Sequence, residues 1–176
     1  MDMDMDWKRQ VQQVLEDAVQ GQELPGVSAL VMQDGREVLF AQAGYADAEN
    51  QIPYRRDTIV RLYSMSKPFT GVAVLILLER GCLDLNDPVA RYLPGFVDAR
   101  VFRADGCGTE SAERPVTIYD LVSMTAGLSY PGTEDAASLA ADRIFSEIDR
   151  RLYTEEAMTT VEIANAIGRL PLAFQP

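Results

Sequence analysis

One stretch decides the fold of this chain: Ser64-Met65-Ser66-Lys67-Pro68-Phe69-Thr70-Gly71, followed without a break by the apolar residues from Val72 to Leu78. An apolar run without a polar face is typical of a helix inside a domain, so we expect this helix to be buried. Pro68 is tolerated only near a helix start, and Gly81 is a typical residue just after a helix end. The sequence therefore predicts a buried helix from about Ser64 to Arg80.

Ser64 and Lys67 are three residues apart, which places them on the same side of that helix. A serine hydroxyl is a weak nucleophile until a base takes its proton. The chain has no histidine, so no Ser-His-Asp triad can form within it. A lysine that is shielded from water can be neutral and can accept a proton. We therefore predict Ser64 as the catalytic nucleophile and Lys67 as its base, with the helix N-terminus close to a developing oxyanion.

The spacing alone also fits a structural interpretation, in which Ser64 caps the helix and Lys67 is a solvated residue of its first turn. The position of the lysine favours the catalytic interpretation. Only two lysines are present, and Lys67 is the one outside the N-terminal segment, at the mouth of the most hydrophobic helix.

The segment from Tyr63 to Thr70 is similar to the nucleophile motif of the penicillin-recognising serine hydrolases. This family includes class C β-lactamases, D-alanyl-D-alanine carboxypeptidases and family VIII carboxylesterases. The similarity covers residues 25–130 well and continues in six segments: Pro25–Ser28, Gly44–Asp47, Glu79–Val89, Tyr92–Pro94, Val116–Leu121 and Thr125–Leu128. The resemblance implies an α+β fold of the β-lactamase/transpeptidase type. In it, residues 1–62 form an N-terminal helix and a β-hairpin of the sheet domain, and residues 63–176 form a mostly helical domain that carries the nucleophile.

The resemblance also implies an activity. Ser64 would form an acyl-enzyme with an ester, lactone or β-lactam carbonyl, Lys67 would act as base, and the Ser64 backbone N–H would form half of an oxyanion hole. The family normally adds a Tyr-x-Asn or Tyr-x-Ser motif and a Lys-Thr-Gly-like strand motif, and this sequence contains neither. The segment Leu170–Pro176 resembles the one that shortly precedes that tyrosine. We therefore expect the N-terminal part of a longer hydrolase, without the C-terminal strands of the sheet and inactive or weak by itself.

A second hypothesis comes from another functional class. The chain could be a catalytically silent binding or assembly module that kept the fold and the Ser64–Lys67 pair. In either case the hairpin over residues 27–43 would keep an open edge, which invites pairing with another strand. The expected partners are a small-molecule ester or β-lactam substrate, and the missing C-terminal part or a second copy at the open edge.

Composition narrows the functional classes. The chain has 176 residues, 47% of them apolar, and a net charge of −11, which argues against nucleic acid and anionic membrane surfaces as partners. The start of the chain is acidic and lacks the apolar core of a signal peptide, so a cytoplasmic location is predicted, or a periplasmic one if an export signal has been removed. No histidine and two cysteines argue against a metal site, and no cofactor is predicted.

The remaining elements follow from periodicity, capping residues and turn signals. We predict a helix over 4–20, strands over 27–33 and 36–43 around the Asp34-Gly35 turn, an irregular connection over 44–58, and a helix from Asp87-Pro88 to Tyr92. Residues 101–115 are predicted as an exposed loop. A helix capped by Thr117 and Asp120 is expected to run through Met124, and another to begin at Thr159 or Thr160. Residues 133–158 are predicted as a solvated helical face, or alternatively as a cap over the active-site mouth.

Overall fold

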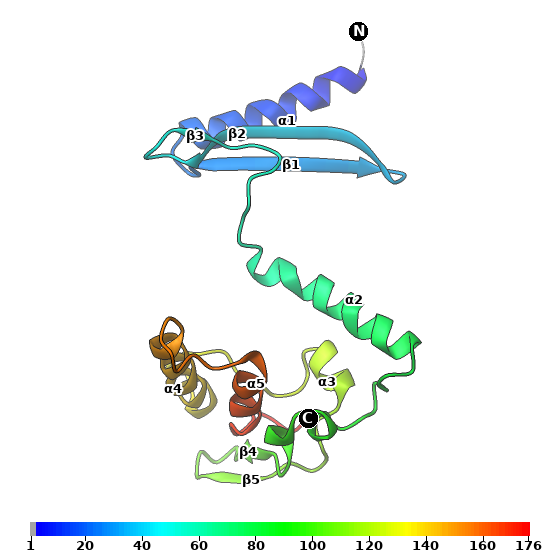
Figure 1. Ribbon diagram of the computed structural model, residues 1–176, viewed down its shortest axis with the longest axis vertical. Coiled ribbons are helices and arrows are strands. Elements are labelled where there is room, and N and C mark those ends of the chain that lie inside the picture. The colour runs from blue at the N-terminus through cyan, green and yellow to red at the C-terminus, as the bar shows by residue number, and fades with distance from the viewer. Residues whose placement is uncertain (1–2) are drawn as a thin grey trace. The chain divides into compact units, whose positions relative to one another are not determined.

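The computed structural model describes residues 3–176, with side chains from Asp6 onward (Figure 1). The chain divides into two compact units, the first ending at Tyr63 and the second running from Ser64 to Pro176. Each unit has its own secondary structure, and the two are described separately.

The first unit is a helix on an antiparallel sheet. It contains α1 (Met3–Gln20), β1 (Gly26–Gln33), β2 (Arg36–Asp47) and β3 (Ile52–Pro53), in the sheet order β1-β2-β3. Figure 1 shows α1 lying along the β1–β2 hairpin, where its partly buried apolar side chains include Val11, Leu15 and Val19. The predicted helix and hairpin are therefore confirmed.

The hairpin turn has the backbone that its sequence predicts. Asp34 has φ of 50° and Gly35 has φ of 74°, and two positive φ values in succession match the twist of the flanking strands. The predicted irregular connection after residue 43 is wrong in part. Strand β2 continues to Asp47 and pairs with β3, because Gly44 has φ of 76° and no side chain to collide with the nearby carbonyl oxygen of Pro25.

Strand β1 forms one edge of this sheet. Among the described strands it pairs only with β2, from Gly26 opposite Gly44 to Gln33 opposite Arg36. Leu30 and Met32 are exposed on one face, whereas Ala29 and Val31 on the other face are partly buried. The outer edge of β1 thus offers unpaired backbone groups next to exposed apolar side chains.

The second unit opens with the nucleophile helix. A 3-10 turn, η1 (Tyr63–Met65), leads into α2 (Ser66–Glu79), and Gly81 follows with φ of 66°. The predicted helix is confirmed, but its predicted burial is wrong: no residue of α2 is buried, and Phe69 is 70% exposed. No other helix or strand among the described residues packs extensively against α2. Because α2 is apolar on every side, contacts along one side leave its other apolar sides exposed to water.

The rest of the second unit consists of short elements around a small core. They are η2 (Val89–Arg91), η3 (Pro94–Phe96), β4 (Arg100–Phe102), β5 (Thr109–Ser111), α3 (Ile118–Val122), α4 (Ala136–Arg151) and α5 (Thr160–Gly168). Two predictions are wrong here. The helix after Asp87-Pro88 is a single 3-10 turn, because Pro88 is extended and the Asp87 carboxylate accepts hydrogen bonds from Arg91 and Tyr92 instead of capping. The predicted loop over 101–115 contains the β4–β5 hairpin.

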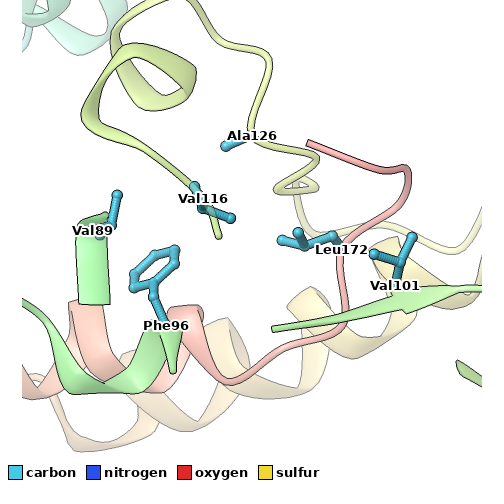
Figure 2. Packing of buried hydrophobic residues seen from close by; sticks show 6 residues of the cluster. All are labelled: Val89, Phe96, Val101, Val116, Ala126 and Leu172. Carbon is cyan, nitrogen blue, oxygen red and sulfur yellow. The ribbon is translucent and has the colours of Figure 1, made fainter. Parts of the chain in front are cut away.

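Six buried side chains form the core of the second unit, as Figure 2 shows: Val89, Phe96, Val101, Val116, Ala126 and Leu172. Leu172 is 1% exposed and extends the small sheet, because its N–H donates to the carbonyl of Arg100 and its carbonyl accepts from the N–H of Phe102. This parallel bridge between Val101 and Leu172 explains why Val101 is buried although charged residues lie next to it in the sequence.

Three capping boxes fix the helix starts of this unit. The pairs are Thr117 with Asp120 in α3, Asp135 with Ser138 in α4, and Thr159 with Glu162 in α5. The capping residues predicted for α3 and α5 are confirmed, although α3 ends at Val122 instead of Met124. Helix α4 is not wholly a solvated face, since it buries one side through Ala137, Ser138, Ala141 and Ile148.

Candidate active site

The structure brings the two predicted site residues together. Ser64 lies in the η1 turn, one turn before Lys67 in the first turn of α2. The Lys67 Nζ donates a hydrogen bond to the Ser64 Oγ over 3.0 Å. No side chain caps the N-terminus of α2, so the partial positive charge of this helix end stays close to Ser64. The arrangement places a hydroxyl and an amine at the distance that proton transfer requires.

The surroundings of the pair differ from the prediction. Both Ser64 and Lys67 are exposed, whereas we expected Lys67 to be desolvated inside the unit. The cause is the exposure of α2, which leaves the first turn of the helix in water on most sides. The site therefore differs from the prediction in its exposure to water, and agrees with it in the contact between Lys67 and Ser64.

Lys67 lines a cavity of about 270 Å³, which we call the Phe145 cavity. Its walls come from α2, α3, α4, α5 and the segment after α3. Most of the lining side chains are apolar or aromatic: Leu121, Met124, Ala126, Leu128, Tyr130, Phe145 and Ile167, with Asp120 and Ser129 as further polar neighbours. A pocket with apolar walls and one amine at its rim can bind an apolar group next to a reacting centre.

The carboxylate of Asp120 is fully engaged, although it borders this cavity. Arg114 donates two hydrogen bonds to it, at 2.6 and 2.9 Å, and Thr117 donates from its N–H and its hydroxyl at 2.9 and 2.7 Å. These donors, the Arg114 side chain first, hold the pKa of Asp120 far below its usual range. Asp120 therefore fixes the start of α3, and both of its carboxylate oxygens already accept hydrogen bonds.

Lys67 also lines a second hollow. The α2–α3 groove has a volume of about 500 Å³ and separates the first turns of α2 from α3. Its lining is mainly apolar and includes Ser66, Lys67, Thr70, Gly71, Val74, Leu83, Ile118, Leu121, Val122 and Met124. Lys67, Leu121 and Met124 line both hollows.

Sequence reasoning missed the residues of the Phe145 cavity. Neither Tyr130 nor Phe145 was predicted as a site residue. Phe145 of α4 lines the cavity that Lys67 also lines, and the alternative prediction of a cap over the active-site mouth stays a prediction. No spacing rule connects Phe145 to Lys67, since their place in one cavity lining depends on how α4 packs.

Within residues 3–176, no helix is both long and apolar enough to cross a membrane. The side chains of the described residues also form no group of three or more His, Cys, Asp or Glu placed to hold a metal ion. Cys82 and Cys107 are both exposed and are not bonded to each other.

Comparisons with known proteins identify the family. The sequence matches the β-lactamase family over residues 11–176. It is 39% identical over 166 residues to esterase EstB of Burkholderia gladioli, a match that covers 93% of this chain and 38% of EstB. The structure is similar to that of EstCE1, described as a hydrolase with promiscuous acyltransferase activity, with a TM-score of 0.79 and 30% identity over 98% of this chain and 42% of EstCE1.

A class C β-lactamase from Rhodobacter sphaeroides is also similar, with a TM-score of 0.51 and 28% identity over 74% of this chain and 33% of the β-lactamase. This chain therefore belongs to the β-lactamase family of penicillin-recognising serine hydrolases, and its fold is of the β-lactamase/transpeptidase type. The predicted family and fold class are confirmed. The chain spans about two fifths of the length of EstB and EstCE1.

Proposed function

We propose that this chain carries the nucleophile and the base of a serine hydrolase that acts through an acyl-enzyme on Ser64. The observation that carries the proposal is the 3.0 Å hydrogen bond between Lys67 Nζ and Ser64 Oγ at the start of α2. Membership of a family that includes an esterase and a class C β-lactamase supports it. The substrate would contain an ester, lactone or β-lactam carbonyl.

In the proposed mechanism the substrate binds over the Ser64–Lys67 pair and excludes water from it, and Lys67 Nζ acts as the base. As Ser64 Oγ attacks the carbonyl carbon, Lys67 Nζ takes the hydroxyl proton, and the carbonyl oxygen becomes an oxyanion near the N-terminus of α2. The bond to the leaving group then breaks, and the leaving group takes the proton from Lys67. In the second step Lys67 Nζ takes a proton from a water molecule whose oxygen attacks the ester carbon of the acyl-enzyme. The bond from that carbon to Ser64 Oγ then breaks, Ser64 Oγ takes the proton from Lys67, and the acid is released.

Covalent labelling tests this proposal directly. The protein is incubated separately with 4-nitrophenyl acetate and with a penicillin, and its intact mass is recorded over time. We expect one acyl group per chain, absent in Ser64→Ala and reduced at least 100-fold in rate in Lys67→Met. Ser66→Ala is the matched control, because Ser66 is two residues away but lacks the lysine contact, and it should acylate as the unchanged protein does.

Two outcomes would refute the proposal. An adduct that persists in Ser64→Ala would place the nucleophile elsewhere. An acylation rate that Lys67→Met leaves unchanged, with the protein folded by circular dichroism, would show that Lys67 is not the base. The reagent that reacts faster would indicate whether esters or β-lactams are the substrate class.

The second candidate function is a catalytically silent binding or assembly module. The observation that favours it is the unpaired outer edge of β1, beside the exposed Leu30 and Met32. Sedimentation velocity over a range of concentrations tests it, because edge-to-edge pairing gives a dimer. Replacing Leu30 by lysine should then return the protein to a monomer, whereas a monomer at all concentrations would refute self-association.

A further inference from the structure

We propose that a separate pocket of the second unit, which neither Ser64 nor Lys67 lines, binds a small monocarboxylate with an apolar body. The pocket has a volume of about 460 Å³, and we call it the Arg151–Arg169 pocket. Its walls come from η3, the end of α4, the segment between α4 and α5, and α5 with the residue that follows it. The lining residues are Pro94, Arg151, Met158, Glu162, Asn165 and Arg169.

The two arginines of this pocket are available to an anion. Among the described residues, the Arg169 side chain has no hydrogen bond and no ion pair. The Arg151 Nε donates to the carbonyl oxygen of Glu156 over 2.8 Å, which holds the side chain in place. Its Nη1 lies 3.9 Å from the carboxylate of Glu147, which already accepts two hydrogen bonds from Arg150, at 2.9 and 2.7 Å. The Nη groups of both arginines can therefore donate to a ligand, and a guanidinium matches the two oxygens of a carboxylate.

The charges that line the pocket favour a single negative charge on the ligand. Glu162 is its acidic lining residue, and this carboxylate accepts hydrogen bonds from the N–H and the hydroxyl of Thr159, both at 2.8 Å. These hydrogen bonds, and after them the charge of Arg151, hold the pKa of Glu162 below its usual value. One positive charge is thus left uncompensated in the pocket. A monocarboxylate neutralises it, whereas a phosphate with a charge of roughly −2 would add repulsion beside Glu162.

The other walls suit an apolar body attached to the carboxylate. Pro94 and Met158 are the apolar lining residues, and a thioether sulfur makes favourable contacts with aromatic rings. Asn165 accepts from the N–H of Gly95 over 2.6 Å and donates to the carbonyl of Val161 over 2.8 Å, which leaves one of its amide hydrogens for a ligand. The volume falls within the roughly 300–1,000 Å³ of small-molecule sites.

The pocket is independent of the candidate active site. Glu162, Asn165 and Arg169 follow one another at spacings of three and four residues, so they lie on one face of α5 and its C-terminal cap. Ile167, which lines the Phe145 cavity, is two positions from both Asn165 and Arg169 and therefore lies on the opposite face. Within the part of the chain that the structure describes, the two hollows share no lining residue. The inference therefore stands or falls separately from the proposed function.

The test uses benzoate as the probe, because it combines one carboxylate with one aromatic ring. Ligand-observed NMR titrations of the whole chain at pH 7 and low ionic strength compare benzoate with benzamide, which has the same shape without the charge. Acetate and inorganic phosphate are added as competitors of bound benzoate. We expect saturable binding of one benzoate per chain, at least tenfold tighter than that of benzamide, and we expect acetate and phosphate each to bind at least tenfold more weakly than benzoate.

Variants locate the bound carboxylate. Arg151→Gln and Arg169→Gln should each weaken benzoate binding at least tenfold, because each removes charge-assisted hydrogen bonds. Arg143→Gln is the matched control, since Arg143 is exposed on α4 and does not line the pocket, and it should leave the affinity unchanged. Glu162→Gln keeps an acceptor for the Thr159 cap but removes the negative charge, so it should increase the affinity for phosphate at least tenfold. Circular dichroism checks that each variant is folded.

Lys67→Met separates this pocket from the Phe145 cavity, where benzoate could meet another cation. We expect this variant to bind benzoate as the unchanged protein does. The assignment is overturned if benzoate does not bind saturably, if benzamide binds equally well, or if phosphate competes better than benzoate binds. It is also overturned if either arginine variant keeps full affinity, if Glu162→Gln leaves phosphate binding unchanged, or if Lys67→Met abolishes benzoate binding.

Discussion

Replacing Asp120 by asparagine would test how firmly the start of α3 is held by Arg114 and Thr117. Asp120 is 2% exposed, and its carboxylate accepts two hydrogen bonds from Arg114 and two from Thr117. Asparagine has nearly the same shape, so the change removes the negative charge and one acceptor without opening a cavity. The NH2 of the asparagine amide would then face a donor, such as the Arg114 guanidinium, which has only donors itself.

The expected cost follows from these contacts. A hydrogen bond to a charged group contributes about 1.5–3 kcal/mol, and breaking a fully buried ion pair costs about 3–5 kcal/mol. Arg114 is 47% exposed, so water can solvate it after the substitution and the penalty is smaller. We expect Asp120→Asn to lower the free energy of unfolding by about 2 kcal/mol at pH 7, and Asp120→Ala by about 3 kcal/mol because Thr117 also loses its acceptor.

The pH dependence gives an independent check. The pKa of Asp120 is lowered in the folded state, chiefly by the Arg114 side chain, whereas an unfolded aspartate titrates near about 3.9. The stabilisation is therefore complete above about pH 5 and decreases as the pH falls toward the folded pKa. The difference between the unchanged protein and Asp120→Asn should shrink by about 1 kcal/mol between pH 7 and pH 3.

The assay is urea unfolding followed by circular dichroism at pH 7, 5 and 3. Asp142→Asn is the control, because Asp142 is exposed on α4 and its substitution should change the free energy of unfolding by less than about 0.5 kcal/mol. The reasoning is refuted if Asp120→Asn costs no more than Asp142→Asn, or if its cost at pH 3 equals its cost at pH 7.

Three further substitutions test the packing. Leu172→Ala should lower the free energy of unfolding by about 3 kcal/mol, because Leu172 is fully buried in the core of the second unit. Gly95→Ala should cost at least about 2 kcal/mol, because the new Cβ would overlap the backbone of Asn165 and push α5 from η3. Gly35→Ala should cost about 1 kcal/mol, because the φ of 74° is unfavourable for alanine. Urea unfolding measures the first two, and hydrogen exchange of β1 and β2 amides measures the third.

A matched substitution at an unpacked position serves as the control for the leucine, and another for the two glycines. Leu152 is exposed after α4, so Leu152→Ala should cost much less than Leu172→Ala. Gly71 lies within α2 with open space around it, so Gly71→Ala should stabilise the helix by up to about 1 kcal/mol, in contrast to both other glycines. If Leu172→Ala and Leu152→Ala changed the free energy of unfolding equally, the packing described for Leu172 would be contradicted. An equal change for Gly95→Ala and Gly71→Ala would contradict the packing described for Gly95.

The local features of the fold could be predicted from the sequence. The Asp34-Gly35 turn, the capping box of Thr117 and Asp120, and the approach of Lys67 to Ser64 each depend on residues within four positions of one another. Short-range sterics and hydrogen bonding determine them before any tertiary packing is formed. The family resemblance on the segment from Tyr63 to Thr70 also gave the correct fold class.

The features that depend on distant contacts could not be predicted in this way. The burial of α2 was expected from its apolar run, but burial depends on which elements pack against the helix. The strand β4 was missed because its pairing is completed by Leu172, far along the chain. The position of Phe145 in the cavity wall depends likewise on the packing of α4, and its sequence neighbourhood resembles that of any amphipathic helix.

The bridge between Val101 and Leu172 also sets a time at which the second unit can fold. Leu172 lies 71 positions after Val101, and a ribosome adds about 5–20 residues per second, so β4 waits roughly 4 to 14 seconds for this neighbour during synthesis. Contacts of such sequence separation also form slowly, because the intervening loop must close first. During that interval the apolar surface of α2 is already exposed, which makes the nascent chain a candidate for chaperone binding before its core exists.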